Sequence, residues 1–299
     1  MTHRRAVLLM ICVTLMWSIA GIVTRHLDSA RGFEVTFWRS LFNALALALM
    51  LAVLQGPSRL WRSLRSGGRP LWVSGLCWCV MYTAFMLAIT LTTVANVLVT
   101  MALAPLFTAL GARLALDHRL ALRTWAAIVV AGAGIAWMYG AELSVTEPRH
   151  LLGSAVALCV PIATAVNWTL LQHLYRRPGS GAPPDMLAPV LLGALLSAAL
   201  ALPLAWPLGA SAHDLRLLGL LGVVQLAIPC LLAVRVAHVL SAPEVSLLGL
   251  LEVVFGVLWV WLGSDERPSP AVLGGGALVL GALAANEAVS LRRTHRAAA

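Results

Sequence analysis

The chain has 299 residues, of which 60% are hydrophobic and only 11% are charged. Soluble globular proteins carry roughly 25% charged residues, and a water-soluble fold of this length could not bury so much apolar surface. The composition excludes a soluble protein and indicates a chain that lies in a lipid bilayer. The formal net charge of +9 would also suit a nucleic-acid-binding protein. The arginines, however, lie in short segments between apolar runs, so we expect no nucleic-acid partner.

Ten apolar runs follow one another along the chain, and a helix of about 20 such residues crosses the hydrocarbon layer. The first run follows Arg4 and Arg5, as in a signal peptide, but it is too long for the apolar part of one. We therefore predict an all-α integral membrane protein with ten transmembrane helices. These are expected at residues 6–24, 33–54, 71–91, 94–116, 122–139, 151–174, 186–208, 215–240, 245–262 and 271–289.

The arginines also predict the orientation of the chain. With the N-terminus in the cytoplasm, 15 of the 21 arginines fall on cytoplasmic segments and 6 on outer ones. This bias is the one that positively charged loops show in membrane proteins. We expect both termini to be cytoplasmic, in a multi-pass protein of a bacterial inner membrane.

A weak internal repeat divides the chain into residues 1–145 and 146–299. Ala115-Leu116-Asp117-His118-Arg119 and Gly263-Ser264-Asp265-Glu266-Arg267 lie 148 residues apart, each at the end of the fourth helix of its half. Because each half has five helices, an odd number, the second half must be inverted relative to the first. Inverted repeats are typical of secondary transporters, whose substrate site lies near the membrane midplane between the halves.

Small residues and cysteines are interpreted as packing residues. Stripes of small residues mark the last helix of each half and are expected to let helices pack closely, with a dimer contact as the alternative. They comprise Gly132, Ala136 and Gly140 in one half, and Ala277, Gly281 and Ala285 in the other. The five cysteines lie inside apolar runs, so we expect them to be reduced and buried. No nucleotide, metal or catalytic motif is found, and we expect no cofactor and no metal.

Several short stretches, in order along the chain, carry a family resemblance. They are Leu15-Met16-Trp17-Ser18, Phe37-Trp38-Arg39, Tyr82-Thr83-Ala84-Phe85, Thr93-Val94-Ala95-Asn96-Val97, Leu103-Ala104-Pro105-Leu106-Phe107, Leu250-Leu251-Glu252-Val253-Val254 and Asp265-Glu266-Arg267. With them the sequence resembles the drug/metabolite transporter superfamily, in particular its EamA-type ten-helix members and, among these, amino-acid exporters of the YddG type. Val253 stands where many members have proline, and Asp117-His118-Arg119 is a diverged version of the acidic-Arg ending. Both departures weaken what the resemblance implies about the substrate.

Two charged side chains fall inside apolar runs. A charge at the membrane midplane costs about 2.5 to 3.5 kcal/mol on insertion scales, so it usually faces a cavity or a partner. Glu252 is expected either to bind a substrate amine or a proton, or to be a protonated carboxyl bonded to a neighbouring helix. Arg39 could hold a substrate carboxylate, but snorkelling to the outer headgroups or pairing with Glu34 is the favoured interpretation.

Further polar and aromatic side chains lie within the predicted helices. The polar ones must find partners in lipid, either another helix or a cavity, and deep aromatics could form the walls of a substrate site. With Glu252 and Arg39, the candidate cavity residues are Trp17, Asn43, Trp78, Tyr82, Asn96, Thr100, Asn167, Trp168, Gln225. Five further tryptophans are assigned to the interfacial belt, namely Trp61, Trp72, Trp206, Trp259 and Trp261.

The function predicted from these features is an alternating-access secondary transporter that exports small metabolites, most of all amino acids, among them aromatic ones. The cavity is expected between helices one, three, four, six, eight and nine. The partners are a small-molecule substrate and the lipid bilayer, and the protein is expected to be a monomer or weak dimer. The alternatives are nucleotide sugars, sugar phosphates or drug-like cations as substrates, a membrane-embedded enzyme, or a non-transporting membrane partner.

Overall fold

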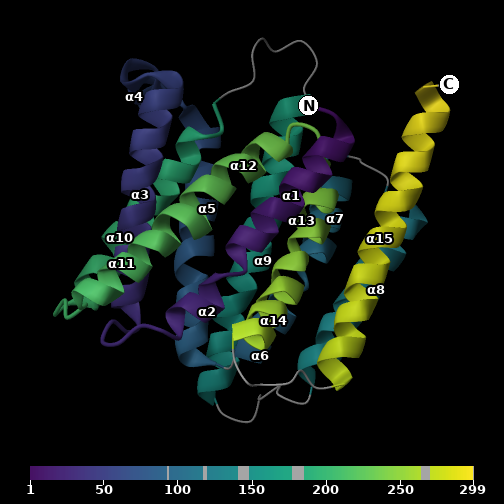
Figure 1. Cartoon of the computed structure of the whole chain (residues 1–299). Helices are drawn as coiled ribbons and strands as arrows, with labels where there is room; N and C mark the ends of the chain where they lie inside the picture. Colours follow the sequence, from purple (N-terminus) through teal and green to yellow (C-terminus); the bar gives the residue numbers. More distant parts are fainter. Residues whose placement is uncertain (93, 117–119, 141–147, 177–184, 264–269, 299) are drawn as a thin grey trace.

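The computed structural model describes residues 1–92, 94–116, 120–140, 148–176, 185–263 and 270–298, and these residues form helices and no strand. Figure 1 shows the helices as a bundle. Before the middle of the chain they are α1 His3–Trp17, α2 Ala20–Thr24, α3 Phe33–Gln55, α4 Pro57–Ser66, α5 Gly68–Leu91, α6 Val94–Met101, α7 Ala104–Leu116 and α8 Leu122–Tyr139. They continue with α9 Pro148–Arg176, α10 Ala188–Ala205, α11 Ala212–Leu220, the π-helix η2 Leu221–Ala227, α12 Ile228–Val236, α13 Ala242–Gly249, α14 Leu251–Gly263 and α15 Pro270–Ala298.

Most of the predicted spans are present as long apolar helices. Seven are long and apolar enough to cross a membrane, and two shorter apolar helices lie at Leu122–Met138 and Pro270–Asn286. The chain is therefore a multi-pass membrane protein. The seven long segments are His3–Thr24, Phe33–Gln55, Gly68–Ile89, Val97–Leu116, Leu151–Arg176, Ala188–Ala205 and Ala212–Val236.

The two ends of the bundle differ in charge. The start of α1 carries Arg4 and Arg5, and α4 carries Arg59, Arg62 and Arg65. In Figure 1 the start of α1, all of α4 and the last turns of α15 lie at the same end of the bundle, which we call the arginine-rich end. The helices α2 and α14 run to the opposite end.

Interruptions divide three of the predicted helices. The first breaks between α1 and α2, where Ser18 Oγ accepts a hydrogen bond from Trp259 Nε1 at 2.8 Å. Trp259 is thus half-buried against α1, while Trp61, Trp72 and Trp206 are exposed as belt residues would be. The side chain of Trp261 lies outside the described residues. The other two breaks separate α6 from α7 and α13 from α14.

The small-residue stripes do not form the contact that we predicted. The helices α8 and α15 pack along each other, but through Gly134 and Gly275, where a Cβ added at Gly134 would lie 2.7 Å from the carbonyl oxygen of Gly275. The predicted stripes lie on other faces: a Cβ at Gly132, Gly140 or Gly281 would meet nothing within 4 Å. The packing interpretation of the stripes is therefore wrong, because the two helices are rotated so that neighbouring small residues meet.

The cysteines are all free, as expected, but they are not all buried. Cys77, Cys79 and Cys230 are buried, whereas Cys12 and Cys159 are exposed on the surface of the bundle. A surface that faces lipid accepts a thiol as readily as the core does. An apolar run therefore indicates membrane, but does not tell which of its residues are buried.

Candidate functional site

A cavity lies inside the bundle, between segments from both parts of the chain. Its volume is about 150 Å³. Because one water needs about 10 to 15 Å³ measured this way, the cavity has room for a small metabolite. Seven of the predicted residues line it: Trp17, Arg39, Trp78, Tyr82, Trp168, Gln225 and Glu252.

Arg39 is the cation among the residues that line the cavity. It lies on α3 and is only 2% exposed. Its Nη2 donates to the carbonyl oxygen of Tyr82 at 3.1 Å, and its Nε has no hydrogen-bond partner. The favoured interpretation of Arg39 as a snorkelling residue or a partner of Glu34 is wrong. Glu34 instead accepts hydrogen bonds from the backbone of Gly209 and Ala210, at 2.8 and 2.7 Å.

Glu252 is the acid among the lining residues and lies at the second position of α14, just past the interruption after α13. No ion pair within 4.0 Å joins it to Arg39 in the part of the chain that the structure describes. A hydrogen bond from Glu252 to a neighbouring helix, the alternative interpretation, is also absent among these residues. Cation and anion thus face one cavity without neutralising each other directly.

Aromatic side chains form much of the apolar wall. The rings of Trp78 and Tyr82 stack with centroids 5.6 Å apart, and Trp78 meets Trp168 edge to face at 5.8 Å. Trp17 and Phe85 complete this set. Such pairs prefer stacked or edge-to-face arrangements, which fix the orientation of each ring. The wall is therefore preformed, and it suits an apolar or aromatic group.

Gln225 lies in the π-helix η2 and joins the cavity to the break in the first helix. Its Nε2 donates to the carbonyl oxygen of Trp17 at 3.3 Å, and its Oε1 has no partner. The wider π turn is marked by the N–H of Ile228, which donates to the carbonyl oxygen of Val223, five residues back. π turns inside α-helices are frequent at functional sites.

A close helix contact fixes η2 against the turn of α3 that carries Arg39. A Cβ added at Gly222 would lie 2.5 Å from the Cβ of Phe42, 2.8 Å from the backbone nitrogen of Asn43 and 2.9 Å from the carbonyl oxygen of Arg39. Only glycine fits at this position, so the backbones of η2 and α3 touch. The contact holds Arg39 and Gln225 in a set relation to each other.

Three predicted cavity residues, Asn43, Asn167 and Thr100, are not among the described residues that line the cavity. Asn43 is fully buried beside Tyr82, and both of its amide atoms lack a hydrogen-bond partner. Asn167 accepts a hydrogen bond from Ser74 Oγ at 2.6 Å and so ties α9 to α5. Thr100 is half-buried on α6. Asn96 belongs to α6, but its side chain lies outside the described residues.

Most of the aliphatic and sulfur-containing residues that line the cavity were not predicted from the sequence. Within a membrane helix such side chains look the same whether they face lipid, another helix or a cavity. A signal exists for Phe85, Ala104, Leu250 and Val253, which belong to stretches that carry the family resemblance. Others that we missed include Met10, Met81, Met101, Thr164, Cys230 and Ser246.

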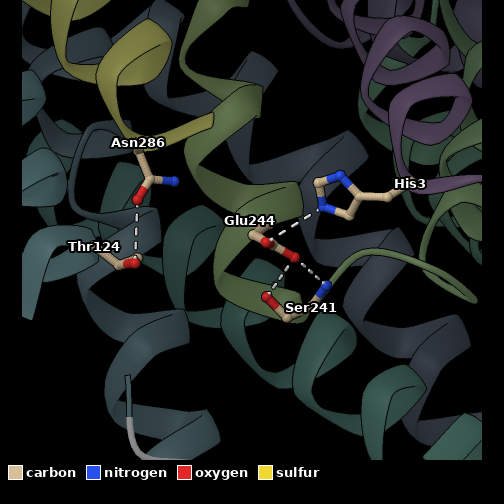
Figure 2. Close-up of polar contacts among 5 residues, drawn as sticks. All are labelled: His3, Thr124, Ser241, Glu244 and Asn286. Atoms are coloured by element: carbon tan, nitrogen blue, oxygen red, sulfur yellow. Dashed lines mark hydrogen bonds and ion pairs between the residues drawn. The ribbon is translucent and has the colours of Figure 1, made fainter. Parts of the chain in front are cut away.

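At the arginine-rich end, the N-terminal part of α1 contacts the start of α13. His3 Nε2 lies 3.6 Å from Glu244 Oε1, as Figure 2 shows. The other oxygen of Glu244 accepts hydrogen bonds from the backbone nitrogen and the hydroxyl of Ser241, both at 2.8 Å. Nearby, Thr124 Oγ1 donates to Asn286 Oδ1 at 3.1 Å and joins α8 to α15 (Figure 2).

At the opposite end, two carboxylates bind the backbone of distant segments: Asp214 of α11 binds the segment between α2 and α3, and Glu34 of α3 binds the segment between α10 and α11. The buried carboxylate of Asp214 accepts hydrogen bonds from the backbone nitrogens of Asp28, Ser29 and Ala30, at 2.7, 3.0 and 2.9 Å. The carboxylate of Glu34 accepts hydrogen bonds from the backbone nitrogens of Gly209 and Ala210 in the same way. We call this arrangement the two-carboxylate cluster. The cavity thus lies between a polar contact at each end of the bundle.

Within the described part of the chain, no group of three His, Cys, Asp or Glu side chains could hold a metal ion. Among the described residues, the site offers the cation Arg39, the anion Glu252, the unpaired acceptor of Gln225 and an aromatic wall.

Comparisons with known proteins agree with this membrane fold. A solved structure described as "Crystal structure of protein" aligns with a TM-score of 0.76 and 20% sequence identity, over 97% of this chain and 99% of that one. At this identity the likeness shows a shared fold. The search of the curated proteins gives no match. The family model that matches is the EamA-like transporter family, and residues 4–140 of this chain are similar to it.

Proposed function

We propose that this protein is a secondary transporter that exports small zwitterionic metabolites, foremost amino acids and among them aromatic ones, by alternating access. The observation that carries the proposal is the pair of opposite charges in one cavity, Arg39 and Glu252, which are not bonded to each other. A buried charge needs compensation, and the carboxylate and ammonium of an amino acid compensate both at once. The guanidinium fork of Arg39 matches a carboxylate.

The walls support the same class of substrate. Trp17, Trp78, Tyr82, Phe85 and Trp168 surround the cavity with aromatic surface, which suits the apolar or aromatic side chain of an amino acid. Sugar phosphates and nucleotide sugars carry more negative charge than one arginine neutralises. A drug-like cation would leave Arg39 without an anion.

We propose that the transporter has ten transmembrane helices in two inverted halves, residues 1–145 and 146–299. The interruptions of the chain support this repeat. Met101 ends α6 and Gly249 ends α13, 148 residues later, which is also the spacing between Asp117 and Asp265. Alternating access then consists of opening the contact at one end of the bundle while the other stays closed.

The proposed location is a bacterial inner membrane with both termini in the cytoplasm. The arginine bias of the sequence supports this orientation, and so does the position of the start of α1 and the end of α15 at one end of the bundle (Figure 1). The working unit is a monomer or weak dimer. Net transport is driven by the substrate gradient or a coupled ion, with Glu252 as the candidate proton site.

A counterflow assay with the purified protein in liposomes tests the proposed substrate class. Liposomes are loaded with unlabelled tryptophan, and entry of labelled tryptophan is followed. Unlabelled competitors are leucine, tryptamine, indole-3-propionate, a sugar phosphate and a nucleotide sugar. We expect the amino acids to compete and the two tryptophan analogues, each with one charge missing, to compete far less. Counterflow that responds to the sugar phosphate or the nucleotide sugar, but not to amino acids, would contradict the proposal.

A further inference from the structure

The helix α4, with the sequence PSRLWRSLRS, was not predicted from the sequence, where residues 57–66 fell in a connection between two membrane helices. It begins with Pro57 directly after Gly56, whose φ of 85° turns the chain out of α3. It ends before Gly68, whose φ of 58° starts α5. Two glycines in the left-handed region thus separate a short helix from both of its neighbours.

The two faces of α4 differ sharply. Leu60 is only 8% exposed and, with the half-buried Leu64, packs against the main core of the bundle. Arg59, Arg62 and Arg65 are all exposed. At about 100° per residue, these arginines cover an arc opposite Leu60 and Leu64, so the helix shows a basic face to its surroundings.

The arginines of α4 have no acidic partner. The sequence contains no aspartate or glutamate between Glu34 and Asp117. Among the described residues, none of the three arginines forms an ion pair within 4.0 Å. Asp185, which bonds to the last residue of α3, accepts hydrogen bonds from Gln55 Nε2 and from the backbone nitrogen of Leu187 and forms no ion pair with these arginines. A basic face with no internal counter-charge calls for anions from outside the chain.

The surroundings of this face are those of a bilayer surface. Trp61, on the edge between the apolar and the basic arcs, is 65% exposed, and tryptophan prefers the headgroup level of a membrane. The helix lies at the end of α3 (Figure 1), which is long and apolar enough to cross a membrane. Basic amphipathic helices with a neighbouring tryptophan lie in the interface plane and attract anionic lipids.

We propose that α4 is a binding surface for anionic phospholipids, whose phosphate groups are held by Arg59, Arg62 and Arg65 and whose acyl region is met by Trp61. Each arginine near an anionic surface strengthens binding roughly fivefold, so the three together contribute on the order of a hundredfold. The helix contacts both α3 and α10. A lipid on α4 therefore also steadies the contact between these two segments. This proposal stands independently of the substrate.

The test compares lipid binding by the full-length protein and two triple variants. The first is Arg59→Gln, Arg62→Gln, Arg65→Gln. The matched control, Arg4→Gln, Arg5→Gln, Arg113→Gln, removes the same charge from other exposed arginines. Each purified protein is titrated in detergent with phosphatidylglycerol or phosphatidylcholine, and retained lipid is counted by native mass spectrometry. We expect the α4 variant to bind phosphatidylglycerol on the order of a hundredfold more weakly, and the control to bind it like the unmodified protein.

Two further measurements test whether the loss of binding comes from the charge of α4 and concerns the lipid. Replacing the three arginines of α4 by lysine keeps the charge and should retain most of the binding, which a merely misfolded helix would not. Inorganic phosphate alone should not displace the lipid at equal concentration. Equal losses in the α4 variant and the control, no loss in either, or displacement by inorganic phosphate would each overturn the proposal.

Discussion

Glu252 is the residue on which proton coupling would depend, because it is the acid that faces the cavity. Glu252→Gln keeps the size of the side chain but removes the charge that binds the substrate ammonium or a proton. Since a hydrogen bond to a charged group contributes about 1.5 to 3 kcal/mol, we expect amino-acid exchange to weaken roughly 10- to 150-fold and to lose its dependence on pH. Counterflow at several pH values measures both effects. Glu252→Asp, which keeps the charge, is the control, and an unchanged rate and pH profile in Glu252→Gln would remove Glu252 from the mechanism.

Arg39 should decide which charge a substrate must carry. In Arg39→Gln the fork that matches a carboxylate is lost, so the variant should no longer distinguish tryptophan from tryptamine. The measurement is the ratio of the concentrations at which each compound halves counterflow. We expect the ratio to fall towards one. Tryptophan that keeps its full advantage over tryptamine would show that another group binds the carboxylate.

Charged side chains were the part of the site that the sequence predicted best. A charge inside an apolar run is costly, so Arg39 and Glu252 stand out, although the sequence favoured the wrong role for Arg39. Asn43 and Asn167 are not among the residues that line the cavity, and the sequence could not show this because an amide serves equally well between helices. Their position depends on the rotation of each helix about its axis. Helices that are apolar on every face carry no pattern that fixes this rotation.

The element that positions the site is the contact between η2 and α3 at Gly222. A methyl group in Gly222→Ala would overlap the backbone of Asn43 and Arg39, and such overpacking costs about 1 to 3 kcal/mol. We expect lower thermal stability in detergent and slower counterflow, since Arg39 must shift. Gly219→Ala is the matched control: its Cβ would meet the ring of Phe42 at 4.0 Å, an ordinary contact. Equal behaviour of the two variants would show that the contact does not position Arg39.

Interruptions of helices were harder to predict than the helices themselves. Apolar runs predict membrane spans directly, because length and composition suffice. The breaks after Trp17, Met101 and Gly249 lie within such runs, and a backbone group that such a break frees can take a partner from a distant element. Gln225, which donates to the carbonyl oxygen of Trp17, is one such partner. The helix α4 was missed because it is too short and too polar to resemble a span.

At the scale of the whole molecule, the two-carboxylate cluster joins distant parts of the chain. Asp214→Asn removes the negative charge to which three backbone N–H groups donate. A hydrogen bond to a charged group contributes about 1.5 to 3 kcal/mol to the free energy of unfolding. We expect a lower unfolding temperature and faster cleavage by protease between α2 and α3. Asp28→Asn is the control, since its exposed side chain takes no part in these contacts. Equal protease resistance in both variants would mean that the cluster does not hold this end together.

In the proposed architecture, the arginine-rich end of the bundle faces the cytoplasm and the opposite end faces the outside. Asp28 lies at the opposite end, Ser58 lies on α4 at the arginine-rich end, and both are exposed. In a variant whose five native cysteines are replaced, a thiol reagent that does not cross membranes should label Asp28→Cys in intact cells. It should label Ser58→Cys only after lysis, because arginine-rich segments stay in the cytoplasm. A tag at each terminus should also become accessible only after lysis. Labelling of Ser58→Cys in intact cells would reverse the orientation, and termini on different sides would exclude an even number of crossings and with it the inverted repeat.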